Sequence, residues 1–98
     1  MRPVLLTKTA EREFQRGFNH YQNENPAVAP RFRDAIVARF TEIQENPELF
    51  RKVAARTRRA VVQSFPYVIL FIDEGHRIVV TAVFHTSRDS AQLQRRLI

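Results

Sequence analysis

The chain has 98 residues, which is enough for one domain, over residues 1–98, with one hydrophobic core. Its hydrophobic fraction of 44% is too high for an intrinsically disordered protein, and the lack of cysteine excludes disulfides and thiolate metal sites. The sequence shows no secretory signal and no apolar run of about 20 residues that could cross a bilayer. We therefore expect a cytoplasmic protein that makes no membrane contact.

The net charge of +6 comes entirely from the second half of the chain. Residues 1–50 hold seven basic and seven acidic residues, whereas residues 51–98 hold nine basic and three acidic ones. A field of one sign attracts polyanions and acidic protein segments. Net charge also keeps a small domain soluble, so the charge alone leaves a binding surface and a merely solvated surface both open.

The first residues predict a short strand and then a helix. Pro3–Leu6 is expected to be the strand, because proline lacks a donor and belongs at a strand start or edge. Thr7 or Thr9 can cap the helix that follows. Gly17 lies beside the apolar stripe of that helix and is expected to allow close contact with a neighbouring helix. The helix is predicted over Lys8–Glu24 from apolar residues three and four positions apart, namely Ala10, Phe14, Phe18 and Tyr21.

A second helix is predicted to end before Asn46-Pro47, but two starting points are open. Asn25 can cap a helix that begins at Pro26, although Pro30 would then remove an early hydrogen bond; otherwise the helix begins near Pro30. Two amphipathic helices joined by so short a loop predict an antiparallel hairpin whose apolar stripes pack against a sheet. The stripe of the second helix consists of Phe32, Ile36, Phe40 and Ile43.

The second half predicts three consecutive antiparallel strands. The first of them is expected over about Arg58–Ser64. A basic loop or irregular strand leads into it. The second, Tyr67–Ile72, lies in the longest apolar run of the chain, and the third, Arg77–His85, follows a hairpin turn over residues 73–76. A short helix is expected over Asp89–Ile98. The predicted fold is α+β in the order β-α-α-β-β-β: a short N-terminal strand and an antiparallel helical hairpin packed on a small antiparallel sheet.

Neither a metal site nor a cofactor site is predicted. The three histidines lack the spacing of metal ligands, and the two glycines are too far apart for a phosphate-binding loop. The best candidate site is the polar end of the last strand, His85–Asp89. Arg88 could bind a phosphate or a carboxylate, and His85 could serve as acid, base or hydrogen-bond donor. A sheet-end salt bridge with a hydrogen-bonded histidine would explain the same residues equally well.

Three segments together resemble the RelE/ParE superfamily of bacterial toxins. They are Asn46-Pro47-Glu48-Leu49, Phe65-Pro66-Tyr67-Val68-Ile69-Leu70-Phe71 and Val83-Phe84-His85-Thr86-Ser87-Arg88-Asp89. The resemblance covers nearly the whole chain, and the length, element order and basic charge agree with it. It implies the toxin half of a type II toxin–antitoxin module. The implied partner is a cognate antitoxin whose extended segment wraps the toxin, and operator DNA would be reached only through that antitoxin.

The superfamily has two main activities, and the residues favour one of them. RelE-like members are ribosome-dependent messenger-RNA endonucleases, whereas ParE-like members inhibit DNA gyrase. RelE-like ribonucleases typically carry an arginine just after the tyrosine that opens the central strand, and a tyrosine near the C-terminus. This chain has Val68 after Tyr67, and its tail carries Gln94-Arg95-Arg96. The resemblance therefore implies a ParE-like gyrase inhibitor, a binding protein and not an enzyme, whose expected effect is growth arrest.

The resemblance also indicates which residues to test. No catalytic residue is expected on the ParE-like branch. If the chain is instead a ribonuclease, the catalytic candidates are His85, Arg88 and Arg59. A degenerate member that only binds its antitoxin is a third alternative. Binding of the target or the partner is assigned to Arg58, Arg59, Tyr67, His85, Arg88, Arg95 and Arg96.

Overall fold

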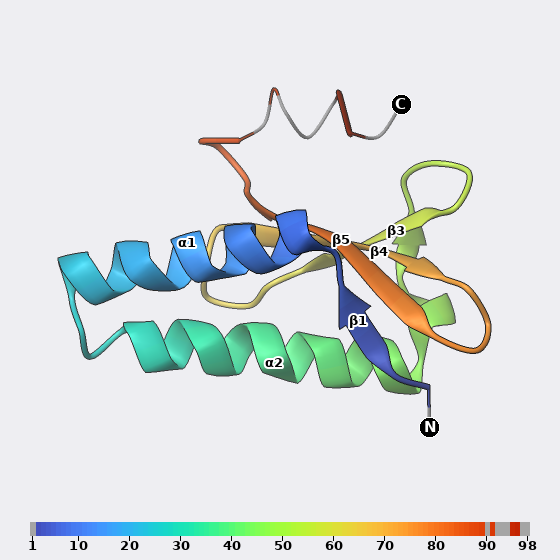
Figure 1. Ribbon diagram of the computed structural model, residues 1–98, viewed down its shortest axis with the longest axis horizontal. Coiled ribbons are helices and arrows are strands. Elements are labelled where there is room, and N and C mark those ends of the chain that lie inside the picture. Colours follow the sequence, from blue (N-terminus) through green and yellow to red (C-terminus); the bar gives the residue numbers. More distant parts are fainter. Residues whose placement is uncertain (1, 90, 92–94, 97–98) are drawn as a thin grey trace.

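A computed structural model describes residues 2–89, 91, 95 and 96 of the chain (Figure 1). It confirms the predicted α+β fold class and adds one strand, β2, which falls in the segment expected to be a loop or an irregular strand. The elements in order are β1 (Val4–Leu6), α1 (Lys8–Glu24), α2 (Ala29–Glu45), a 3-10 helix (Pro47–Leu49), β2 (Arg51–Lys52), β3 (Thr57–Val61), β4 (Tyr67–Asp73) and β5 (Ile78–His85).

The five strands form one mixed sheet in the order β1-β5-β4-β3-β2. As predicted, β3, β4 and β5 are successive antiparallel neighbours. β1, however, lies parallel to β5, with Val4 opposite Ile78 and Leu6 opposite Val80, so the sheet is not purely antiparallel. This pairing joins segments more than 70 residues apart, and a three-residue strand carries no pattern that reveals its direction.

β1 covers only the first part of β5. Its register runs from Ile78 to Val80. A bulge between Leu70 and Phe71 of β4 then shifts the register of β5 by one residue, so that Ala82 faces Leu70. Among the described residues, no strand lies beside the remainder of β5, residues 81–85, on the β1 side. We call this segment the β5 edge.

Local capping sets the ends of the two helices. Of the two predicted candidates, Thr7 and not Thr9 caps α1, by accepting a hydrogen bond from the backbone nitrogen of Ala10 at 3.1 Å. α2 begins at Ala29 with Pro30 in its first turn, where a missing N–H breaks no intrahelical hydrogen bond. The alternative start at Pro26 is wrong, because that residue lies in the turn between the helices.

The predicted hairpin of α1 and α2 covers one side of the sheet, which we call the inner face (Figure 1). Gly17 lies at a close approach between α1, α2 and the sheet. A β-carbon there would be 2.8 Å from Cζ of Phe32 and 3.1 Å from the hydroxyl oxygen of Tyr67. The predicted close helix contact at Gly17 is therefore confirmed. The inner-face core includes Phe32, Ile36, Ile43, Tyr67, Ile69, Phe71, Val80 and Val83.

The opposite side of the sheet, which we call the outer face, has a separate and smaller apolar cluster. Its buried members are Val68, Leu70, Ala82 and Phe84, and Val53 packs against them from the loop after β2. The guanidinium carbon of Arg96 lies 4.6 Å from the centre of the Phe84 ring. A cation in this position is attracted by the face of the ring and shields it from water.

The predicted C-terminal helix, Asp89–Ile98, lies mostly outside the described residues. In the part of the chain that is described, neither helix is long and apolar enough to cross a membrane. The same part contains no group of three or more His, Asp or Glu side chains that could hold a metal ion.

Candidate functional site

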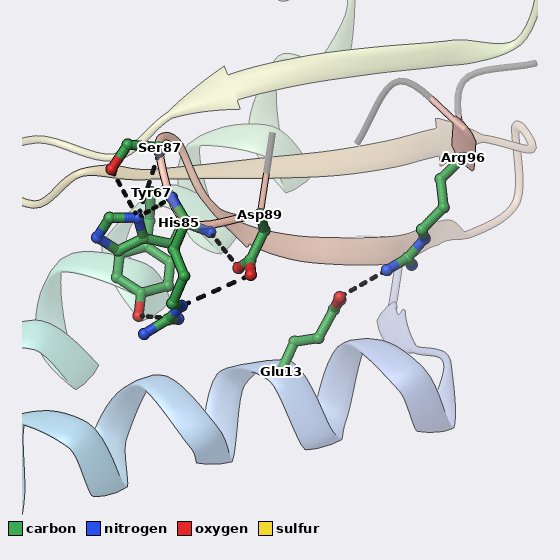
Figure 2. Close-up of polar contacts among 7 residues, drawn as sticks. Glu13, Tyr67, His85, Ser87, Asp89 and Arg96 are labelled. Carbon is green, nitrogen blue, oxygen red and sulfur yellow. Dashed lines mark hydrogen bonds and ion pairs between the residues drawn. The ribbon is translucent and has the colours of Figure 1, made fainter. Parts of the chain in front are cut away.

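Polar side chains gather where β4 begins and β5 ends (Figure 2). Tyr67 and His85 are direct partners in the antiparallel ladder, and their rings meet edge to face with centroids 5.3 Å apart. The turn after β5 then brings further polar groups back toward Tyr67. We call Tyr67, His85, Ser87, Arg88 and Asp89 the Tyr67 cluster.

His85 acts as a hydrogen-bond acceptor for the turn that follows it. Its Nδ1 accepts from the backbone nitrogen of Arg88 at 3.0 Å and from that of Ser87 at 3.3 Å. Since backbone N–H groups only donate, Nδ1 carries the lone pair and the ring proton lies on Nε2. Burial lowers the pKa of His85, and the charge of Arg88 lowers it further. The neutral imidazole thus holds the turn together and offers Nε2–H as a donor.

Arg88 is tied to both neighbouring polar groups. Its NH2 group donates to the hydroxyl oxygen of Tyr67 at 3.3 Å, and its Nε lies 3.5 Å from a carboxylate oxygen of Asp89. Burial acts to lower the pKa of Arg88, but the hydrogen bond to Tyr67 and the charge of Asp89 outweigh it, so the pKa is raised. The sheet-end salt bridge that the sequence left open is therefore present, and Arg88 stays cationic.

Charged side chains take the place of a neighbouring strand along the β5 edge (Figure 2). The backbone nitrogen of Val83 donates to Glu13 on α1 at 3.0 Å. Arg96 donates to the other carboxylate oxygen of Glu13 at 2.6 Å and also to the carbonyl of Thr81. Further along, the backbone nitrogen of His85 donates to Asp89 at 3.1 Å. An ion pair between tail and helix thus satisfies groups that an open strand edge would expose.

The structure brings together three of the residues to which binding was assigned and separates two others from them. Tyr67, His85 and Arg88 meet on the inner face at one end of the sheet. Arg58 and Arg59 lie on β3 and pair with the far half of β4. Arg59 is opposite Leu70 and so points to the outer face, away from His85. The three ribonuclease candidates therefore do not surround one point.

The other residues to which binding was assigned differ in whether contacts within the chain hold their side chains. Arg58 donates to the backbone carbonyl of Phe50 at 2.7 Å, which ties it to the chain that leads into β2. Arg96 is held by Glu13, whereas Arg95 is exposed. Glu13 was not identified from the sequence. In the sequence it is an acidic residue at the margin of an apolar helix stripe. That position does not predict which residues it contacts.

Chemically, this arrangement favours binding over catalysis. The Tyr67 cluster presents the cation of Arg88 and the Nε2–H group of His85, which can both hold an anion. Proton transfer in both directions would need an acid and a base on either side of one reacting group. The acceptor nitrogen of His85 is already taken by two backbone donors.

Comparisons with known proteins agree with the fold and indicate a family. The family model described as "ParE toxin of type II toxin-antitoxin system, parDE" matches residues 4–90. The fold is similar to a solved chain from P. aeruginosa titled "Chromosomal ParDE TA system". The TM-score is 0.76 at 17% identity, over 87% of this chain and 96% of that chain. A search of curated proteins found no match. The likeness to the solved chain shows the fold, and the family match confirms the resemblance on its ParE side.

Proposed function

Because this chain belongs to the ParE toxin family of type II toxin–antitoxin systems, we propose that it inhibits DNA gyrase and that a cognate antitoxin neutralises it. It acts by binding its target in the cytoplasm and carries no catalytic site of its own. The solved chain of similar fold comes from a ParDE system, which supports an antitoxin partner here as well.

The apolar outer face is the observation that carries the gyrase proposal. The position where a RelE-like ribonuclease has an arginine is Val68, which is 5% exposed and packs with Leu70, Ala82 and Phe84. An arginine there would lose its hydration among apolar neighbours. Val68 and its buried neighbours therefore supply no acid or base to a phosphate at the position where the ribonuclease arginine would stand.

The ribonuclease alternative would have to use groups that lie apart. His85 and Arg88 stand on the inner face, whereas Arg59 stands on the outer face. General acid–base cleavage needs its groups around one phosphate. The separation supports the ParE-like branch, and the ribonuclease activity is an alternative outcome of the test below.

The positive charge of the second half of the chain supports an antitoxin partner with an acidic segment. The excess of +6 belongs to residues 51–98, which include the strands β2 to β5 and the tail. An extended segment that carries acidic and apolar residues would complement this half. We assign its contacts, and those of the target, to the positions given above, with exposed Arg95 favoured over Arg96. The operator sequence would be recognised only through the antitoxin.

A supercoiling assay with purified gyrase tests the proposal. The folded, antitoxin-free chain should block supercoiling or trap cleaved DNA, and the antitoxin encoded beside it should reverse the effect. Arg95→Gln should weaken inhibition more than His85→Ala does, because the proposed inhibition depends on charged contacts and needs no proton transfer by His85.

Two results would overturn the proposal. A folded chain that arrests growth but leaves gyrase active, together with codon-positioned transcript cuts that His85→Ala abolishes, would establish the ribonuclease. A chain that binds the antitoxin but leaves growth untouched when expressed alone would indicate a degenerate member.

A further inference from the structure

The exposed side of α1 carries a row of basic and amide side chains that neither the core nor the Tyr67 cluster uses. Arg12 and Arg16 lie one helical turn apart, which is about 6 Å along the axis. Asn19, His20 and Asn23 continue the same side of the helix. We call these five residues the α1 basic stripe. With Arg88, they line a shallow hollow of about 490 Å³.

The charge of the stripe is not neutralised within the described part of the chain. No carboxylate there lies within 4.0 Å of Arg12 or Arg16. The nearby carboxylate of Glu13 faces the β5 edge, where Val83 and Arg96 occupy both of its oxygens. Two arginines one turn apart without counter-charges repel each other and create a local positive potential.

Two of the lining residues, Arg88 and Asn19, are oriented by neighbours so that each turns a hydrogen-bond donor toward the hollow. Arg88 directs its Nε and one terminal nitrogen to Asp89 and Tyr67, and among the described residues the other terminal nitrogen has no acceptor. Gln15 donates to the side-chain oxygen of Asn19 at 2.9 Å, so the amide nitrogen of Asn19 is turned away and free to donate. The described lining therefore offers several hydrogen-bond donors around the three guanidinium charges of Arg12, Arg16 and Arg88.

We propose that the α1 basic stripe binds the sugar–phosphate backbone of nucleic acid. Guanidinium and amide N–H groups are the usual partners of phosphate oxygens. An acidic peptide would also seek an apolar anchor, and the lining residues of this hollow are all basic or polar. From Arg12 to Asn23 the stripe extends about 16 Å. One strand of a duplex carries a phosphate every ~3.4 Å of helix axis, so several phosphates face a stripe of this length.

The inference does not depend on gyrase as the target. Phosphate contacts carry no sequence information, so the stripe binds without sequence preference. It would hold the protein against a nucleic acid while another surface engages the protein target. The stripe itself lies on α1, and Arg88 is the one residue of the hollow that is also among the target contacts proposed above.

Fluorescence anisotropy with the full chain and a labelled 20-nucleotide single strand tests this site. The double variant Arg12→Gln/Arg16→Gln should bind about tenfold more weakly or worse, because it loses two charge-assisted contacts. The slope of log K against log salt should fall by roughly 1.4, since each single-strand phosphate contact contributes about 0.7. The matched control Arg31→Gln/Arg33→Gln removes the same charge from exposed positions on α2 and should keep the slope of the parent chain.

Three outcomes would overturn the inference. The parent chain could fail to bind the oligonucleotide at 50 mM salt, or both double variants could lose affinity equally, which would indicate bulk charge alone. Polyglutamate could bind as tightly and lose affinity to the same Arg12/Arg16 variant, which would assign the stripe to an acidic protein segment. Circular dichroism of each variant separates these results from misfolding, and the assay contains no gyrase, so it is independent of the supercoiling test.

Discussion

The inner and outer faces of the sheet are both apolar along β4 and β5, but they are covered in different ways. Two helices cover the inner face, and their aromatic rings pack against its rings at an angle. Between ring centroids, Phe32 lies 4.9 Å from Tyr67 on β4 and 5.4 Å from Phe65 in the turn before β4. On the outer face, Val53 packs from a loop and the charged head of Arg96 lies over Phe84.

The two kinds of cover should contribute differently to the stability of the fold. Aromatic packing on the inner face buries large apolar areas. Water can reach these areas only if the hairpin separates from the sheet. The cation above Phe84 is held mainly by polar contacts to α1 and the β5 edge, and such contacts exchange readily with water. We therefore expect the inner face to dominate the free energy of unfolding and the outer face to tolerate change.

The largest expected effect comes from truncating the inner-face core. Phe32→Ala should lower the free energy of unfolding by about 3–5 kcal/mol, because the ring is fully buried and its cavity is surrounded by other rings. Phe84→Ala on the outer face should cost less, since a cover made of a loop and an arginine can collapse into the space. Urea unfolding of both variants compares them, and a greater loss for Phe84→Ala would contradict the comparison.

A smaller effect is expected at the β5 edge. Arg96→Met keeps an apolar side chain over Phe84 but leaves Glu13 and the carbonyl of Thr81 without their partner. The free energy of unfolding should fall by about 1–2 kcal/mol. Arg95→Met is the matched control, because Arg95 is exposed and its loss should change stability by no more than about 0.5 kcal/mol. Equal losses for the two variants in urea unfolding would show that the edge contacts do not stabilise the fold.

The smallest expected effect is a pH dependence that originates at His85. Its pKa is lowered in the folded chain, by burial first and then by Arg88, so the unfolded chain binds more protons between the folded pKa and the ordinary value of 6.5. The stability that the neutral ring contributes is therefore fully present above pH 6.5 and is lost as the pH falls through the folded pKa.

Thermal unfolding between pH 5 and pH 8 measures this dependence. His85→Gln cannot titrate and should lose less stability than the parent chain on acidification. The prediction fails if the two chains lose equal stability over that range. The carboxylate of Asp89, which opposes the shift, remains in both chains, so the comparison isolates the ring.

Much of the fold followed from local patterns. The 3.6-residue period placed α1 at the bounds that the structure has, Lys8–Glu24, and the cap was one of the two threonines predicted for it, Thr7. The long apolar run predicted a strand covered on both faces, and β4 is such a strand. The motifs at 65–71 and 83–89 were sufficient to indicate the family. These features depend on neighbours in the sequence, whose geometry is set by the backbone itself.

The arrangement of the candidate site depended on contacts that no local pattern encodes. The sequence could not show that Arg59 and His85 stand on opposite faces, because a bulge or a one-residue slip reverses every side chain of a strand. Nor could it show that Glu13 closes the β5 edge, a contact between residues 70 positions apart. The sequence by itself determined which segments are helix or strand and which family they belong to. The tertiary structure decided which charges meet, because pairing between distant segments depends on register and on the packing of the whole domain.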